Sequence, residues 1–342
     1  MKNTEKCVGE LFASETVGNI IIRVGRSDDV LFELFRSREA RTLTSRTLFD
    51  MASVTKIVVT TSLSLIAMQE GKISPSDKVS RFFSVPDDKN ELSVWHLLTH
   101  TMGIGHKSML KGGEYSKIQD YILSIPSDIP IGSNVLYSCP GFILLGRILE
   151  EVFGKRLDEA FYERVSAPLG MEASVFLPDR TKDIVNANIG ANECGLVNDY
   201  NCRFLGGVAG NAGLFSNVDD LTKYVKALLG RPSPLFSEDI LSLAWQNHTP
   251  NMDDSRGLGF LVVDERYAQT GKLFPYGSIG HCGHTGTSVF LDPKSKFYTI
   301  ILSDATASTV QKYGKENYDE VKRMRHDLHE AIKKDLVEEA GK

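Results

Sequence analysis

The chain has 342 residues, a length typical of about two domains, and its 42% hydrophobic and 24% charged residues are ordinary for a globular protein. Its formal net charge of -5 gives no electrostatic reason to expect a nucleic acid or an anionic membrane as a partner. Five cysteines without a framework spacing, and a charged N-terminus without an apolar core, predict a cytoplasmic protein with free thiols and no secretory signal.

Hairpin patterns occur near both ends of the chain. Near the N-terminus, residues 19–24 and 30–35 are rich in apolar and β-branched side chains and flank a short polar turn. Near the C-terminus, residues 287–291 and 297–302 flank a second turn, which contains Pro293. Each pattern predicts two antiparallel strands.

The middle of the chain is predicted to be mostly helical. A helix that is apolar on nearly every face is expected from Ile57 to Met68, with Gly71 just past its end. Another helix is expected to have Ser216 as its N-cap and to end at Gly230. The C-terminal tail has apolar residues at steps of three and four, which predicts an amphipathic helix. Further short helices are expected near residues 93–100, 117–124, 140–153 and 157–165.

Strands at both ends with helices between them predict an α/β fold of the α+β kind. We expect one antiparallel sheet, built from both termini and flanked by helices, with a mainly helical domain inserted. The sheet domain would comprise residues 1–60 and 255–342, and the helical domain residues 61–254. The active site would lie in the cleft between the two domains.

The tetrad Ser53-Val54-Thr55-Lys56 directly precedes the apolar helix. This places Ser53 near the amino end of a core helix, with Lys56 one turn later on the same face. Burial disfavours the ammonium form, so the lysine would be free to take the hydroxyl proton and make the serine nucleophilic. Peptide N–H groups at a helix start also favour negative charge there. The alternative is a serine at an exposed helix end beside a solvated lysine.

A second Ser-x-x-Lys pair shows that the spacing alone does not identify a site. Ser108 and Lys111 have the same spacing, but they lie in a glycine-flanked stretch that is predicted to be a loop. A loop offers no frame that would hold the two side chains together. The helical context therefore favours Ser53 over Ser108.

Two later segments carry further candidate residues. Tyr137 ends a turn-rich loop, where a tyrosine near a cation can move protons, although most such tyrosines serve packing. Residues 278–287 contain two histidines, His281 and His284, and three glycines next to a predicted strand. Glycines at such a place let a ligand or another backbone approach closely.

Other kinds of site are less well supported. A metal site is the rival interpretation for Cys194, Cys202, His281 and Cys282, but their spacing matches no zinc pattern, and we expect no metal or other cofactor. The glycine-rich residues 206–213 fit neither the dinucleotide fingerprint nor the P-loop, so a structural bend beside a pocket is expected. No Gly-x-Ser-x-Gly elbow occurs.

Three separated segments together resemble one family, the serine β-lactamase-like and penicillin-binding superfamily. Residues 47–56 look like its first motif with the usual lead-in. Tyr137-Ser138-Cys139 stands where the family has Tyr-x-Asn, and His281-Cys282-Gly283 stands where it has Lys-Thr-Gly or His-Thr-Gly. The similarity is greatest to the branch of class C β-lactamases, D-alanyl-D-alanine carboxypeptidases and esterases. It covers roughly residues 17–305.

The resemblance implies a role for each matching residue. Ser53 would attack the acyl carbon, and Lys56 with Tyr137 would act as the coupled base and acid. The backbone N–H groups of Ser53 and His284 would hold the oxyanion. His281 would line the opposite wall and orient the substrate, beside Cys139, Cys282 and Gly283 as further substrate-binding positions.

The register of the third motif has an alternative. His284-Thr285-Gly286 matches the literal pattern better than His281-Cys282-Gly283 does. We prefer His281, because relatives commonly carry a further Thr-Gly-Thr-Ser after the motif, here residues 285–288. The spacing to the turn at Pro293 also suits that register.

Three departures from the family pattern bear on the substrate. Cys139 replaces an amide that binds the substrate amide in relatives, and a thiol is a weak hydrogen-bonding group. Cys282 replaces a hydroxyl that helps to hold a carboxylate. His281 replaces a permanent cation with a group that is only partly charged at neutral pH. All three changes weaken recognition of a β-lactam or a peptide carboxylate.

The sequence therefore predicts a serine hydrolase that works through an acyl-enzyme on a small ester or amide. A β-lactamase or D-alanyl-D-alanine carboxypeptidase is the alternative within the same chemistry. A non-catalytic penicillin-binding or regulatory protein is the alternative of another class. The expected partner is a small-molecule substrate, with no nucleic acid and no membrane, and the pattern does not determine the oligomeric state.

Overall fold

The computed structural model describes residues 1–39, 41–105, 117–230 and 232–340. The second Ser-x-x-Lys pair, Ser108 and Lys111, lies outside these residues. Within them, the strands form a six-stranded sheet and a three-stranded sheet. The small sheet has the order β3 (Phe49–Asp50), β5 (Leu214–Ser216), β4 (Val175–Phe176), and β3 leads directly into the turn that carries Ser53.

The large sheet is antiparallel throughout and has the order β2-β1-β9-β8-β7-β6. Its strands are β1 (Asn19–Arg26), β2 (Asp29–Ser37), β6 (Leu261–Val262), β7 (Ile279–Cys282), β8 (Ser288–Asp292) and β9 (Phe297–Ser303). Both predicted hairpins are present, as β1–β2 and β8–β9. Because β1 pairs with β9, the two ends of the chain meet in one sheet, and the predicted fold class is confirmed.

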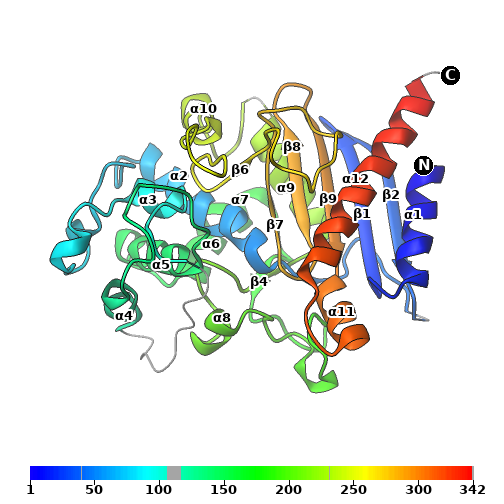
Figure 1. Ribbon diagram of the computed structural model, residues 1–342, viewed down its shortest axis with the longest axis horizontal. Helices are drawn as coiled ribbons and strands as arrows, with labels where there is room; N and C mark the ends of the chain where they lie inside the picture. Colours follow the sequence, from blue (N-terminus) through cyan, green and yellow to red (C-terminus); the bar gives the residue numbers. More distant parts are fainter. Residues whose placement is uncertain (40, 106–116, 231, 341–342) are drawn as a thin grey trace.

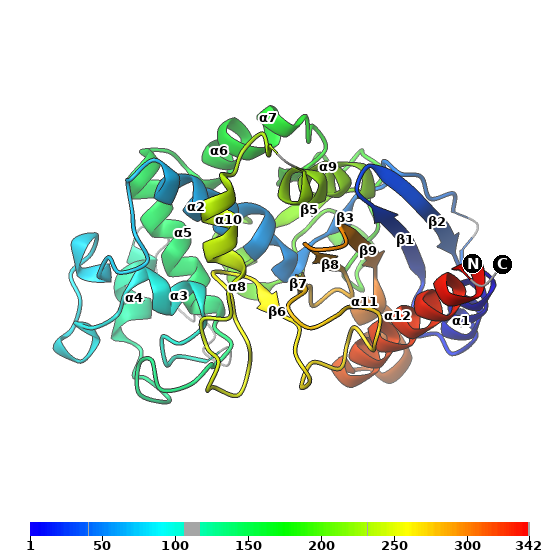
Figure 2. The same ribbon diagram turned by 90° about the horizontal axis from the view of Figure 1, so that it is seen from above.

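Both faces of the sheet are covered, which explains why its central strands are apolar at nearly every position. Along β1, Ile20 and Ile22 belong to the core under α1 (Lys2–Ala13) and α12 (Tyr318–Ala340), whereas Ile21 belongs to the larger core on the opposite face. Figures 1 and 2 show α1 and α12 side by side along one face of the sheet. On the other face, α9 (Val218–Leu229) contacts β9.

The apolar segment after Ser53 is a buried helix, as predicted. It begins with a 3-10 turn, η1 (Ala52–Val54), continues as a wide π-helix, η2 (Lys56–Thr61), and ends as α2 (Ser62–Gln69). By length and composition alone, Ala52–Gln69 could cross a membrane. Because 83% of this segment is buried inside the protein, it has the surroundings of a core helix.

Helices dominate the part of the chain between the two halves of the sheet (Figure 2). The four short helices expected there are present as α3 (Val94–Leu98), α4 (Ile118–Ser124), α5 (Cys139–Phe153) and α6 (Leu157–Phe161). The remaining helices are α7 (Ala167–Leu169), α8 (Tyr200–Phe204), α10 (Glu238–Trp245) and α11 (Ala305–Tyr313). The domain boundaries at residues 60 and 254 stay a prediction, and α9, inside the expected helical domain, packs on the sheet.

One local expectation is wrong, and one helix was not predicted. The helix expected to start at Ser216 is capped instead by Asn217, whose side chain accepts the N–H of Asp220 at 2.9 Å. Ser216 is the last residue of β5, so strand pairing holds its backbone and moves the cap by one residue. The N-terminal helix α1 was not expected, because its polar sequence becomes a helix only through packing against α12.

Candidate active site

Ser53 lies in a tight turn between β3 and the core helix. The preceding residue, Ala52, has a φ angle of 45°, which a residue with a side chain rarely adopts. The carboxylate of Asp50 holds this turn, since one of its oxygens accepts the N–H of Ala52 at 2.8 Å and the other the N–H of Asn198 at 2.6 Å. The turn leaves Ser53 partly exposed, whereas Lys56, three residues later, is fully buried.

Two side chains from distant segments converge on the hydroxyl oxygen of Ser53. Lys56 Nζ donates a hydrogen bond to Ser53 Oγ at 2.9 Å. Tyr137 Oη, from the loop before α5, donates to the same Oγ at 2.8 Å. The two donors also lie close to each other, because Lys56 Nζ is 5.1 Å from the centroid of the Tyr137 ring. The structure thus brings together the three residues that the sequence proposed as catalytic.

The glycine-rich segment 206–213 lies behind Lys56. The carbonyl of Asn211 accepts a hydrogen bond from Lys56 Nζ at 2.9 Å. At Gly210 a Cβ atom would lie 2.1 Å from the carbonyl oxygen of Phe142 in α5, so only glycine allows this close approach. The segment is therefore a structural bend at the back of the site, as expected.

The surroundings of Lys56 and Tyr137 raise the pKa of both groups. Burial on its own would lower the pKa of Lys56, but its interactions with Cys139 and Tyr137 raise that pKa above its ordinary value. Burial raises the pKa of Tyr137 to about 12, although Lys56 opposes the rise. That Lys56 is a free amine stays a prediction, and the direction of its pKa shift speaks against it. We therefore take the general base to be the Lys56–Tyr137 pair in the form that has lost one of its two titratable protons.

We expect the rate constant kcat/KM for ester hydrolysis to rise by about ten-fold per pH unit from about pH 6 to about pH 9. The reactive form of the pair has lost a proton, and its fraction grows as the pH rises toward the raised pKa of Tyr137. A pH-rate profile measured with a neutral ester tests this expectation. A plateau that begins below about pH 7 would show that the base has an ordinary histidine-like pKa.

The third motif lies against the turn that carries Ser53. Thr285 Oγ1 donates to the carbonyl of Asp50 at 2.9 Å, and Thr287 Oγ1 donates to that of Met51 at 3.2 Å. At Gly283 a Cβ atom would lie 2.6 Å from the carbonyl oxygen of Met51, so glycine is required here too. Within the described chain, the N–H of His284 makes no hydrogen bond. This free N–H beside Ser53 suits an oxyanion donor.

The two histidines of this segment have different surroundings. His281 lies in β7 with its ring 6.1 Å from that of Tyr137, and burial holds its pKa well below the usual value, so the ring is neutral. Its Nε2 atom has no hydrogen-bond partner among the described residues. The ring of His284 stacks on Tyr318 at 5.5 Å, and its Nε2 lies 3.2 Å from Glu316. His281 is thus the histidine free to meet a ligand.

Both cysteines that depart from the family pattern lie at the site. Cys139 is buried, and its sulfur lies 3.4 Å from Lys56 Nζ. Cys282 is half-buried, and its sulfur lies 3.1 Å from the hydroxyl of Tyr267. Neither position therefore presents the amide or hydroxyl group that the family pattern has there.

Ser53 opens into a cavity of about 810 Å³ that contains residues the sequence did not suggest. Arg256 is the most informative of them: it is 6% exposed, pairs with Asp254, and has its Cζ atom 5.9 Å from the Tyr137 ring centroid. Its Nε atom has no partner in the described part of the chain. No local pattern marks Arg256, because its neighbours come from other segments. Aromatic side chains complete the wall: Tyr200, Tyr267 and Tyr318.

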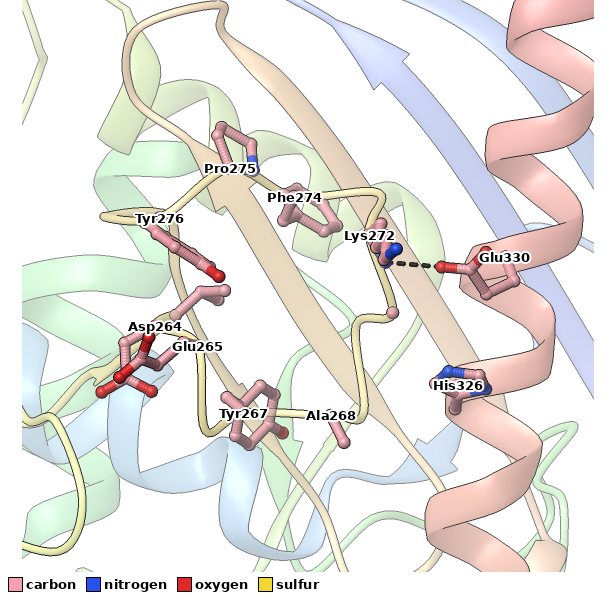
Figure 3. A pocket seen from close by; sticks show the side chains of 12 residues that line it. Asp264, Glu265, Tyr267, Ala268, Lys272, Phe274, Pro275, Tyr276, His326 and Glu330 are labelled. Atoms are coloured by element: carbon pink, nitrogen blue, oxygen red, sulfur yellow. Dashed lines mark hydrogen bonds between the residues drawn. The ribbon is translucent and has the colours of Figure 1, made fainter.

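A second pocket, of about 640 Å³, lies in the loop between β6 and β7 (Figure 3). Its lining includes Tyr276 from the loop and His326 and Glu330 from α12. The N–H of Lys272 donates to Glu330, so the loop is attached to the helix. Tyr267 lines both this pocket and the active-site cavity, but none of the predicted site residues lies in the second pocket.

The alternative metal site is not assembled. Cys202 Sγ contacts the carbonyl of Ala212 at 3.1 Å, and Cys194 Sγ contacts that of Ile184 at 3.6 Å, so both thiols are engaged away from His281. Over the ranges that the structure describes, no group of three or more His, Cys, Asp and Glu side chains could hold a metal ion. All five cysteines are free thiols in the described structure.

Comparison with known proteins agrees with this geometry. Residues 7–321 match the sequence profile of one family, Beta-lactamase. The chain belongs to the beta-lactamase family. This membership confirms the predicted family and the predicted class of enzyme, a serine hydrolase. The individual roles of Ser53, Lys56, Tyr137 and the residues around His281 stay predictions that the geometry supports.

Three beta-lactamase family proteins illustrate the range of relatives. An Escherichia coli (strain K12) protein with the provisional name D-alanyl-D-alanine carboxypeptidase is 29% identical over 311 residues, covering 78% of this chain and 71% of the relative. A class C beta-lactamase in complex with cefoxitin has a TM-score of 0.77 at 16% identity, covering 96% of this chain and 97% of its own. EstCE1, a hydrolase with promiscuous acyltransferase activity, has a TM-score of 0.76 at 20% identity and 97% coverage of both chains.

Proposed function

We propose that this protein hydrolyses a small ester or amide through an acyl-enzyme on Ser53. The observation that carries the proposal is the convergence of Lys56 Nζ and Tyr137 Oη on Ser53 Oγ, at 2.9 and 2.8 Å, at the edge of a cavity of about 810 Å³. If Ser53 and Lys56 only formed a structural hydrogen bond, a second donor, Tyr137, on the same Ser53 oxygen would have no purpose. A nucleophile flanked by a proton-transfer pair is the arrangement that acyl transfer requires.

The reaction proceeds in two halves. As Ser53 Oγ bonds to the acyl carbon, its proton passes to the deprotonated Lys56–Tyr137 pair, and negative charge develops on the carbonyl oxygen. The pair then gives the proton to the leaving group as the bond to that group breaks, which leaves the acyl-enzyme. In the second half a water molecule repeats the sequence, and the proton returns to Ser53 when the acid leaves.

The walls of the cavity favour small neutral substrates. Cys139 and Cys282 offer only thiols, and the neutral ring of His281 stands where the family pattern has a permanent cation or a histidine. Thiols are weak hydrogen-bonding groups, so they hold an amide or a carboxylate poorly. Tyrosine side chains on the wall provide apolar surface for an acyl or alcohol group instead.

We expect p-nitrophenyl esters of short acids to have a higher kcat/KM than penicillins or a D-Ala-D-Ala peptide, by roughly ten- to a hundred-fold. The measurement is a steady-state panel of the three substrate types on one enzyme preparation. The triple variant Cys139→Asn, His281→Lys, Cys282→Thr restores the family residues and should shift the preference toward the β-lactam. If the unmodified protein hydrolyses penicillins efficiently, the preference for esters is wrong, although the serine mechanism stands.

One observation favours β-lactamase or D-alanyl-D-alanine carboxypeptidase activity as a second candidate. Arg256 provides a buried permanent cation in the cavity wall, with its Cζ atom 5.9 Å from the centroid of the Tyr137 ring and with an Nε atom that has no partner among the described residues. A substrate carboxylate could bind there. If this second function is correct, the panel should show penicillin turnover equal to ester turnover. The variant Arg256→Met should then remove penicillin turnover and leave ester turnover unchanged.

A non-catalytic penicillin-binding or regulatory role makes a different demand on the same site. It requires an adduct on Ser53 that forms and does not turn over. Mass mapping of the adducts from a fluorescent penicillin and a fluorophosphonate, beside the ester assay, separates this role from hydrolysis. A cytoplasmic location also stays part of the proposal, supported by five cysteines that are all free thiols.

A further inference from the structure

A buried arginine lies directly behind the third motif. Arg325, in the middle of α12, is 0% exposed. Its Nη2 atom donates a hydrogen bond to the carbonyl oxygen of Gly283, and its Nη1 atom donates to Gln269 Oε1 at 2.8 Å. A residue from the C-terminal helix thus contacts the backbone of the active site.

The charge of Arg325 is not neutralised by a carboxylate. Among the described residues, no acidic side chain lies within salt-bridge distance of it. Its neighbours are the ring of Tyr318, whose centroid lies 5.9 Å from Cζ, together with Tyr267 and Cys282. Burial of a cation without a counter-ion is costly. Because few polar groups screen the charge there, it acts strongly on the nearest dipoles, such as the carbonyl of Gly283.

The carbonyl that Arg325 contacts belongs to the same peptide unit as the N–H of His284. In a trans peptide the two groups point in opposite directions, so this N–H points away from α12. Gly283 itself packs on the turn before Ser53, since a Cβ atom there would be 2.6 Å from the carbonyl oxygen of Met51 and 3.4 Å from the Cβ of Ala52, and His284 lines the same cavity as Ser53. The N–H is also left without a hydrogen bond within the described residues.

We infer that Arg325 is a positioning residue that fixes and polarises the Gly283–His284 peptide, so that the His284 N–H stabilises the oxyanion formed during attack by Ser53. The inference rests on the proposed acyl-enzyme function and adds a residue that does not touch the substrate. A hydrogen bond to a carbonyl oxygen shifts electron density away from the amide nitrogen and strengthens the N–H as a donor. The guanidinium also fixes the peptide plane, and the oxyanion needs a donor whose direction is set before the reaction.

The test compares a p-nitrophenyl ester with its thionoester, in which sulfur replaces the carbonyl oxygen and accepts oxyanion hydrogen bonds poorly. In Arg325→Met we expect kcat for the ester to fall by about ten-fold with little change in KM, because removal of an entire oxyanion donor costs more. The thionoester should lose less, so the ester-to-thionoester ratio of kcat falls toward one. Arg325→Lys keeps the charge without the planar fork, and its ratio should lie between those of the wild type and Arg325→Met.

A matched control is His329→Gln. His329 is as fully buried as Arg325, lies one turn further along α12, and bonds Thr299 Oγ1 and the carbonyl of Gln269 without touching Gly283. This variant should lower the melting temperature but leave the ester-to-thionoester ratio unchanged. If Arg325→Met does not fold, the inference is tested by the ester-to-thionoester ratio of kcat in Arg325→Lys, which should lie below that of the wild type.

The outcomes separate this inference from the function on which it rests. An unchanged ratio in the Arg325 variants, or equal losses for both substrates, overturns the role of Arg325 as long as the wild type hydrolyses the ester and its Ser53 is labelled. If the wild type neither hydrolyses the ester nor forms an adduct on Ser53, the proposed function itself is wrong. A selective loss on the ester, with Ser53 still labelled, supports both.

Discussion

Ser53→Ala is expected to abolish ester hydrolysis and all labelling by an acylating or phosphonylating probe. The variant removes the only oxygen on which Lys56 Nζ and Tyr137 Oη both converge in the described structure. Loss of the nucleophile typically lowers kcat by about 10⁴-fold or more. Because the side chain is small and partly exposed, the fold should be unaffected, so circular dichroism and the melting temperature should match those of the wild type.

Ser62→Ala provides the control for Ser53→Ala. Ser62 lies in the same core helix and is buried, but its hydroxyl bonds the carbonyl of Ile57 and lies beside Tyr224, away from the cavity. It should keep both labelling and turnover. A rate that survives in Ser53→Ala would exclude acyl-enzyme chemistry at this residue, and an adduct on Ser108 would show that the helical context misled us.

Lys56→Met should have the second largest effect, a loss of roughly 10²- to 10⁴-fold in kcat, which is the range of a positioned proton-transfer group. Methionine fills most of the lysine volume but neither donates to Ser53 Oγ nor exchanges protons with Tyr137. Lys56 opposes the rise in the pKa of Tyr137, so its removal should raise the pKa of Tyr137 further. Pre-steady-state measurement of the p-nitrophenol burst would locate the loss in acylation.

Lys89→Met is the matched control for Lys56→Met. Lys89 is also buried, with 2% exposure, but it pairs with Asp88 in a turn before α3. It should lose stability and keep its rate. If Lys56→Met retained a burst of normal rate, Tyr137 alone would suffice as the base, and the coupled pair would be the wrong description.

Much of the fold was predictable because its signals are local. The mainly apolar strands on either side of Asp292-Pro293 and the apolar run after Ser53 are short-range patterns, and the structure has both elements where they were expected. The position of Lys56 relative to Ser53 was also predictable, since both lie on one helix. The helix α1 was missed because a polar sequence of that length is stabilised only by its contact with α12.

The chemistry of the site was less predictable because it depends on contacts between distant segments. Burial on its own would lower the pKa of Lys56, but Cys139 and Tyr137, about eighty residues later, raise it. Arg256 and Arg325 reach the site from segments without any motif, and only the folded structure shows that one lines the cavity and the other contacts Gly283. Contacts between residues that are far apart in the sequence, such as that of Arg325 with Gly283, leave no pattern along the chain.

The pairing of β1 with β9 has a consequence for how the enzyme becomes active during synthesis. Ile20 lies opposite Ser303, so β1 cannot pair with β9 until all the residues between the two strands have been synthesised. Such long-range pairing slows folding and leaves apolar strands exposed in the meantime. The Gly283–His284 peptide and α12 also follow Ser53, Lys56 and Tyr137 in the chain. We therefore expect a nascent chain that contains Ser53, Lys56 and Tyr137 but not yet β7 to be inactive, because it lacks His281 and the peptide after Gly283.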